Sequence, residues 1–72
     1  MDIKKSTGHR IRELRNELGL TQEKLSFKSG IDKTYISEVE NGKRNISIIN
    51  LEKLIKALDV KIINFFNNPI FS

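Results

Sequence analysis

The sequence has no cysteine and no tryptophan, and it has only one histidine and one proline among its 72 residues. Without cysteine, neither a disulfide framework nor a thiolate metal site is possible. The single histidine, His9, stands without a nucleophile, a paired carboxylate or further metal ligands that could act with it. We therefore expect a protein that is not an enzyme and that binds no metal, cofactor or small-molecule ligand.

Long apolar runs are also missing. No stretch approaches the about 20 apolar residues that span a bilayer, and the amino-terminal run MDIKKSTGHR lacks the apolar segment of a secretory signal. We expect a cytoplasmic protein with no membrane partner. Its 72 residues make one small domain. The net charge of +4, from 13 basic and 9 acidic residues, favours a polyanionic partner without establishing one.

The run from Gln22 to Gly42, QEKLSFKSGIDKTYISEVENG, predicts two short helices joined by a tight turn. Thr21 and Asp32 are residue types that cap the amino ends of helices, and Gly30 between the helices reaches a positive φ without steric cost. The predicted inward-facing residues are Leu25, Ile36 and Val39. This spacing is typical of a helix-turn-helix, whose second helix can lie in the major groove of DNA.

Three more helices are predicted around this motif. The first runs from Thr7 to Leu18 with Ser6 as its cap, the fourth follows the cap Ser47, and a short fifth begins at Val60. Inward-facing apolar residues recur at helical spacing: Ile11, Leu14 and Leu18, then Ile48, Leu51, Leu54, Ile55 and Leu58, then Ile62, Phe65 and Phe66. Phe27 is expected to be a partly covered surface aromatic. The prediction is an all-α, compact five-helix bundle over residues 6–66, with short tails at 1–5 and 67–72, of which the first is expected to be loosely ordered.

The chain resembles the Cro/CI-like (XRE) helix-turn-helix family over residues 6–66, and the run GIDKTYISEVENGKRNIS looks most like the controller proteins of restriction–modification systems. The resemblance implies a lambda-repressor-like fold and a homodimeric transcription regulator that binds double-stranded DNA at a palindromic operator. It also implies an ion pair between Arg15 and Glu40. The sequence departs from the family pattern at Ser29, which is often apolar, and at Asp59, which is often glycine.

Base reading is expected at the start of the second motif helix. Lys33 can donate to guanine O6 and N7, and Thr34 can offer its hydroxyl or its methyl group. Ser37 and Glu38 follow one turn later. Glu38 either accepts from a cytosine amino group or repels phosphate, and Tyr35 either approaches DNA or packs on the bundle. The resemblance implies that Arg44 enters a groove.

Phosphate contacts should surround these positions, because they orient a protein on DNA without specifying sequence. Polar and basic residues that flank the motif are the candidates: Gln22, Lys28, Lys43, Asn45 and Ser47. The alternative is a solvated basic loop without a ligand.

The fifth helix has apolar residues on nearly all sides, which indicates a partner surface. We expect a twofold interface that uses Ile63 and Phe66, with Ile62 beside them and Asn64 at the rim. The alternative is that these residues complete the core of a single chain. A second function also fits the pattern, in which a small antitoxin or adaptor uses the same bundle to bind a protein.

Overall fold

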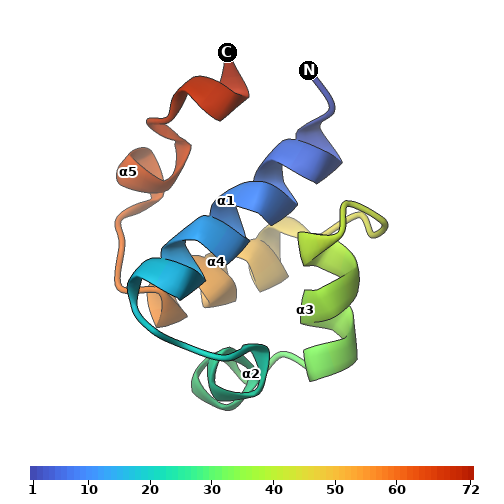
Figure 1. Ribbon diagram of the computed structural model, residues 1–72, viewed down its shortest axis with the longest axis vertical. Helices are drawn as coiled ribbons and strands as arrows, with labels where there is room; N and C mark the ends of the chain where they lie inside the picture. The colour runs from blue at the N-terminus through green and yellow to red at the C-terminus, as the bar shows by residue number, and fades with distance from the viewer.

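The computed structural model describes residues 1–72 and contains no strand. Five α-helices are followed by one 3-10 turn: α1 Ile3–Glu17, α2 Gln22–Ser29, α3 Lys33–Glu40, α4 Ile48–Ala57, α5 Ile62–Phe66 and η1 Pro69–Phe71. The helices α3 and α5 lie on opposite sides of α1, and the two termini lie near each other (Figure 1). The all-α five-helix prediction is confirmed. No helix of this chain has the length and apolar character needed to cross a bilayer.

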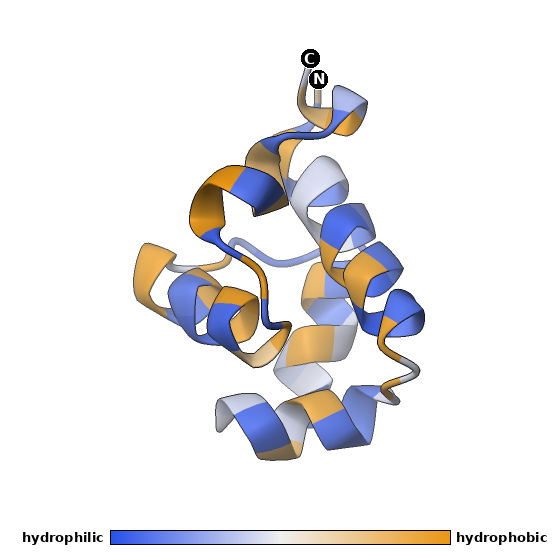
Figure 2. Ribbon diagram, turned by 90° about the vertical axis from the view of Figure 1, so that its left-hand side faces the viewer, coloured by the Kyte–Doolittle hydropathy of each residue, from blue (hydrophilic) through white to orange (hydrophobic).

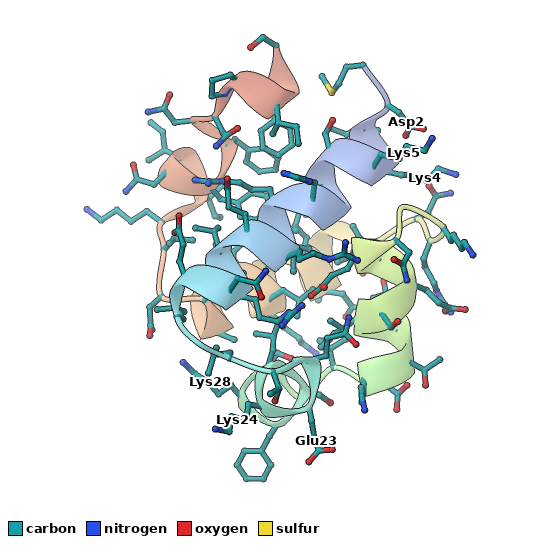
Figure 3. The ribbon with its side chains drawn as sticks, in the orientation of Figure 1. Asp2, Lys4, Lys5, Glu23, Lys24 and Lys28 are labelled. Carbon is teal, nitrogen blue, oxygen red and sulfur yellow. The ribbon has the colours of Figure 1, made fainter.

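Helix α1 begins earlier than the sequence predicted. The side chain of Asp2 accepts hydrogen bonds from the amides of Lys4 and Lys5 at 3.1 and 3.3 Å, so Asp2 is the cap and the segment before Ser6 is helical (Figure 3). The prediction of Ser6 as cap after a loosely ordered tail is wrong. Ser6 is instead buried within the helix.

The helix-turn-helix has the predicted bounds. The hydroxyl of Thr21 accepts from the amide of Lys24 at 3.1 Å, and the carboxylate of Asp32 accepts from the amide of Thr34 at 2.9 Å. Gly30 has a φ of 72°, in the left-handed region that glycine adopts without strain. Local capping chemistry therefore determines where α2 ends and α3 begins.

Eleven buried apolar residues form one core, and they come from all five helices, the α2–α3 turn and Leu58 at the carboxyl cap of α4. Four of the expected inward positions are exposed instead: Leu18, Ile48, Ile62 and Phe66. Leu18 lies just after α1, Ile48 begins α4, and Ile62 and Phe66 lie in α5. Figure 2 shows apolar residues along both α4 and α5. Phe27 is 91% exposed, so the expectation of partial cover is wrong.

The carboxyl-terminal segment is held against α1. Arg10 donates from Nε to the carbonyl of Phe65 at 2.8 Å and from Nη2 to the carbonyl of Asn64 at 3.0 Å. The ring of Phe71 lies 6.0 Å from that of the fully buried Phe65. Residues 67–72, predicted as a tail, thus include a turn whose Phe71 packs on the core.

Candidate nucleic-acid interface

The amino end of α3 is presented to solvent because the helix is anchored by its opposite face. Ile36 and Val39 are 0% and 1% exposed, and they direct that face into the core. Ser26 of α2 donates its hydroxyl to the carbonyl of Ile31 at 2.6 Å, which ties the turn to α2. Lys33 and Thr34 stand in the first turn of α3, both exposed. Neither side chain is part of any ion pair or hydrogen bond within the chain.

The carboxyl end of α3 is closed around a buried charge. The side chain of Glu40 is 0% exposed. Arg15 of α1 donates two hydrogen bonds to it, from Nε to Oε2 at 2.7 Å and from Nη2 to Oε1 at 2.9 Å. Such bidentate, charge-assisted contacts have a fixed geometry. Arg15 also donates to the carbonyl of Leu20 at 2.8 Å. The pair therefore joins α1, the α1–α2 turn and α3.

Two further side chains reach the same carboxylate, and neither contact was predicted from the sequence. Arg12 donates from Nε at 3.3 Å and Gln22 from Nε2 at 3.2 Å, both to Oε1 of Glu40. Burial alone raises the pKa of Glu40, but the hydrogen bonds from Arg15, Gln22 and Arg12 and the charge of Arg15 outweigh it, so the pKa is lowered. The hydrogen bond to Glu40 raises the pKa of Arg15 despite its partial burial. Gln22, predicted to contact phosphate, directs its side chain inward in this structure.

The loop after α3 brings three of the predicted base readers together. Arg44 pairs with Glu38, from Nη1 to Oε1 at 2.8 Å, and its guanidinium carbon lies 4.6 Å from the centre of the Tyr35 ring. The hydroxyl of Tyr35 accepts from the amide of Ser47 at 3.4 Å. Tyr35 thus makes local contacts in this structure, and its approach to DNA stays a prediction. Ser37, on the same helix, is half-buried.

The predicted phosphate contacts are spread over two sides of the molecule. Lys43 and Asn45 are exposed in the loop after α3. Ser47 is exposed as well, and its hydroxyl caps α4 by accepting from the amide of Asn50 at 3.1 Å. Lys28 instead pairs at 3.5 Å with Asp59 at the end of α4, on the side of α2 away from α3 (Figure 3). The structure therefore separates Lys28 from the other candidates.

The predicted interface residues are exposed and have apolar neighbours from a second helix. Ile62, Ile63 and Phe66 are 53%, 74% and 38% exposed, and Asn64 beside them is exposed too. Ile48 and Ile49 from the first turn of α4 are 86% and 68% exposed. A hollow of about 370 Å³ is lined by residues of both helices: Ile48, Ile49, Leu51, Glu52, Ile62 and Phe66. We call the five exposed apolar residues Ile48, Ile49, Ile62, Ile63 and Phe66 the apolar face; the sequence reasoning missed the contribution of Ile49 and assigned Ile48 to the core.

A capped α2–turn–α3 unit, with an anchored second helix whose amino end is open, defines a helix-turn-helix domain. A family model described as helix-turn-helix matches residues 11–65, and the chain belongs to that family. The control protein C.MunI of Mycoplasma sp is 40% identical over 68 residues, which are 93% of this chain and 92% of that protein. The control protein C.BamHI of Bacillus amyloliquefaciens is 44% identical over 55 residues, which are 75% and 68% of the two chains.

Solved structures agree with the sequence relatives. The restriction–modification controller protein C.AhdI from Aeromonas hydrophila superposes with a TM-score of 0.86 at 44% identity, over 92% of this chain and 100% of that chain. The controller C.Esp1396I, solved as a tetramer in complex with its natural 35 base-pair operator, superposes with a TM-score of 0.83 at 42% identity, over 86% and 82% of the two chains. The predicted resemblance to controller proteins is confirmed.

Proposed function

We propose that this protein is a sequence-specific regulator of transcription that binds double-stranded DNA as a homodimer, in the manner of a restriction–modification controller. The observation that carries the proposal is the open amino end of α3, where Lys33 and Thr34 are exposed on a helix anchored along its other face. The operator complex of the relative C.Esp1396I supports it. We propose no catalytic role, and we place the protein in the cytoplasm, where bacterial DNA lies.

The first turn of α3 reads bases in this proposal. The ammonium of Lys33 donates to guanine O6 and N7, which face the major groove, and Thr34 contacts a neighbouring base through its hydroxyl or its methyl group. Lys43, Asn45 and Ser47 lie in the loop that follows α3, where they contact the phosphates that fix the register. The contacts between Glu40 of α3 and Arg15 of α1 hold the carboxyl end of the helix, so that its amino end is already in position before DNA binds.

The apolar face provides the twofold interface. One recognition helix reads only a few base pairs, whereas two helices about 34 Å apart meet successive turns of the same groove. Exposed isoleucines and a phenylalanine gathered from α4 and α5 are unusual on a small monomer, and burying them against a second copy removes them from water. Because α5 and α3 lie on opposite sides of α1 (Figure 1), pairing through the apolar face leaves both copies of α3 open.

Selection of bound duplexes from a random pool, read at several salt concentrations, tests the DNA-binding proposal. We expect the selected sites to be palindromic. The binding constant should fall steeply with salt, because each neutralised phosphate contributes about 0.9 to the logarithmic slope. An absence of duplex affinity would contradict the proposal and favour the alternative of an antitoxin or adaptor. The nearly fully exposed Phe27, flanked by Lys24 and Lys28, is the observation that favours that alternative.

Sedimentation of two variants tests the interface. Ile63→Ala removes a side chain that is 74% exposed, so it should shift the protein toward monomer without unfolding it. Phe27→Ala removes an even more exposed apolar side chain outside the apolar face and should leave the dimer intact. Equal behaviour of the two variants would exclude Ile63 from the interface.

A further inference from the structure

The ion pair between Glu38 and Arg44 places a negative charge among the groups that should face DNA. The two side chains are 44% and 49% exposed, so the pair is open to solvent, and its members meet at 2.8 Å. The face of Tyr35 lies under the guanidinium at 4.6 Å. Arg44 therefore has two partners within its own chain, one anionic and one aromatic.

Backbone hydrogen bonds hold the loop that carries Arg44 against the end of α3. After α3, the amide of Gly42 donates to the carbonyl of Val39 at 3.0 Å, and the amide of Lys43 donates to the carbonyl of Glu38 at 3.0 Å. Gly42 has a φ of 73°, which reverses the chain. The loop thus returns alongside α3 and delivers Arg44 to the side chain of Glu38. The pair results from an ordered turn rather than from two freely moving side chains.

We propose that Glu38 is a specificity-determining residue, which keeps Arg44 in an internal ion pair unless the DNA sequence offers partners for both side chains. This inference rests on the proposed DNA binding. At a matching site, guanine O6 and N7 accept from Arg44, while a cytosine or adenine amino group donates to Glu38. On other sequences, a phosphate can accept from Arg44, but Glu38 is then left unpaired beside the phosphate backbone. The pair therefore weakens binding to random duplex more than binding to the operator.

The variant Glu38→Gln tests this inference because it removes the charge and keeps the shape. Exposed ion pairs are weak, so we expect affinity for random duplex to rise by about two- to fivefold, while operator affinity does not gain and the specificity ratio falls. The salt slope on random duplex should steepen by about 0.9 per subunit, because Arg44 then neutralises one phosphate. Glu17→Gln, an equal charge change at the exposed end of α1, is the control and should change neither quantity.

A double-mutant cycle with Arg44→Gln separates the ion pair from general repulsion of DNA by a carboxylate. In the Arg44→Gln background, Glu38→Gln should no longer steepen the slope. A slope that still steepens there would overturn the inference, and so would an equal gain on operator and random duplex. A loss of operator affinity with no change on random duplex would also overturn it, because Glu38 would then contact a base without restraining Arg44 on other sequences. Wild-type protein without salt-dependent duplex affinity would overturn the proposed function itself, which is a different result from any of these.

Discussion

The two ends of α3 differ in whether their charged side chain is buried and paired. At the carboxyl end, Glu40 is completely covered and accepts hydrogen bonds from Arg15, Arg12 and Gln22. At the amino end, Lys33 is exposed and has no ion-pair partner within the chain. One end of a helix of 8 residues is thus closed around its charge, and the other end is open.

This difference separates stability from recognition along a single helix. Removing one partner of a desolvated ion pair is costly, since it leaves the other charge buried and uncompensated. A solvated charge contributes little. Residues at the amino end of α3 can therefore be suited to a DNA sequence without loss of stability, while Glu40 at the carboxyl end keeps α3 in position. Substitutions at the carboxyl end should therefore change the free energy of unfolding more than substitutions at the amino end.

Glu40→Ala should have the largest effect. It leaves the Arg15 guanidinium, whose side chain is 12% exposed, without its carboxylate. We expect the free energy of unfolding to fall by about 3–5 kcal/mol, measured by urea denaturation. Glu17→Ala removes an exposed carboxylate from α1 and should change the value by less than about 0.5 kcal/mol. Similar losses in the two variants would mean that burial of Glu40 has no special importance.

Gly8→Ala should have the next largest effect, because α1 crosses α3 closely at this residue. A Cβ atom on Gly8 would collide with the carbonyl oxygen of Val39 and approach the backbone of Glu40. Alanine is favoured over glycine inside a helix by about 1 kcal/mol, yet we expect a net loss of about 1–3 kcal/mol from the forced separation of the helices. His9→Ala, at the exposed neighbouring position, is the control. A more stable Gly8→Ala variant would show that the crossing can relax.

The sequence predicted α2, the turn and α3 correctly because their limits depend on local chemistry. Thr21, Gly30 and Asp32 each act on amides or φ angles within three residues of themselves. The start of α1 was missed because Asp2 and Ser6 are both good caps, and the burial of Ser6, which decides between them, has no local signal. The close crossing at Gly8 has no local signal, since glycine inside a helix looks unfavourable until its neighbour is known.

The candidate site was predictable in its residue types but not in its pairings. The exposure of Lys33 and Thr34 follows from the apolar period of α3, which assigns the inward face. The contacts of Glu40 with Arg12 and Gln22 join residues 28 and 18 positions apart, and the pair of Glu38 with Arg44 depends on a chain reversal after α3. Ile48 is exposed although its spacing fits the core, because helical period does not show whether another helix of the chain covers a given position.

Acid should weaken the closed end of α3 and leave the open end unchanged. The pKa of Glu40 is lowered in the folded chain, so its contribution to stability is complete above the usual carboxylate pKa of 4.5 and is lost as the pH falls through the lowered value. Wild-type protein should therefore lose more unfolding free energy than Glu40→Gln when the pH is lowered from neutral into that range. Parallel losses in urea titrations at each pH would assign the acid sensitivity to other carboxylates.

Lys33→Ala should have the smallest effect on stability and a large effect on recognition. A cation in the first turn of a helix opposes the helix dipole, so its removal should leave the free energy of unfolding within about 0.5 kcal/mol of wild type or raise it slightly. Operator binding should weaken by about 1–3 kcal/mol, with relaxed preference at one base pair and little change on random duplex. Lys53→Ala, on the exposed side of α4, is the charge-matched control for both measurements. An equal loss on operator and random duplex would assign Lys33 to phosphate, and a loss of stability would show that the amino end of α3 is not the open end.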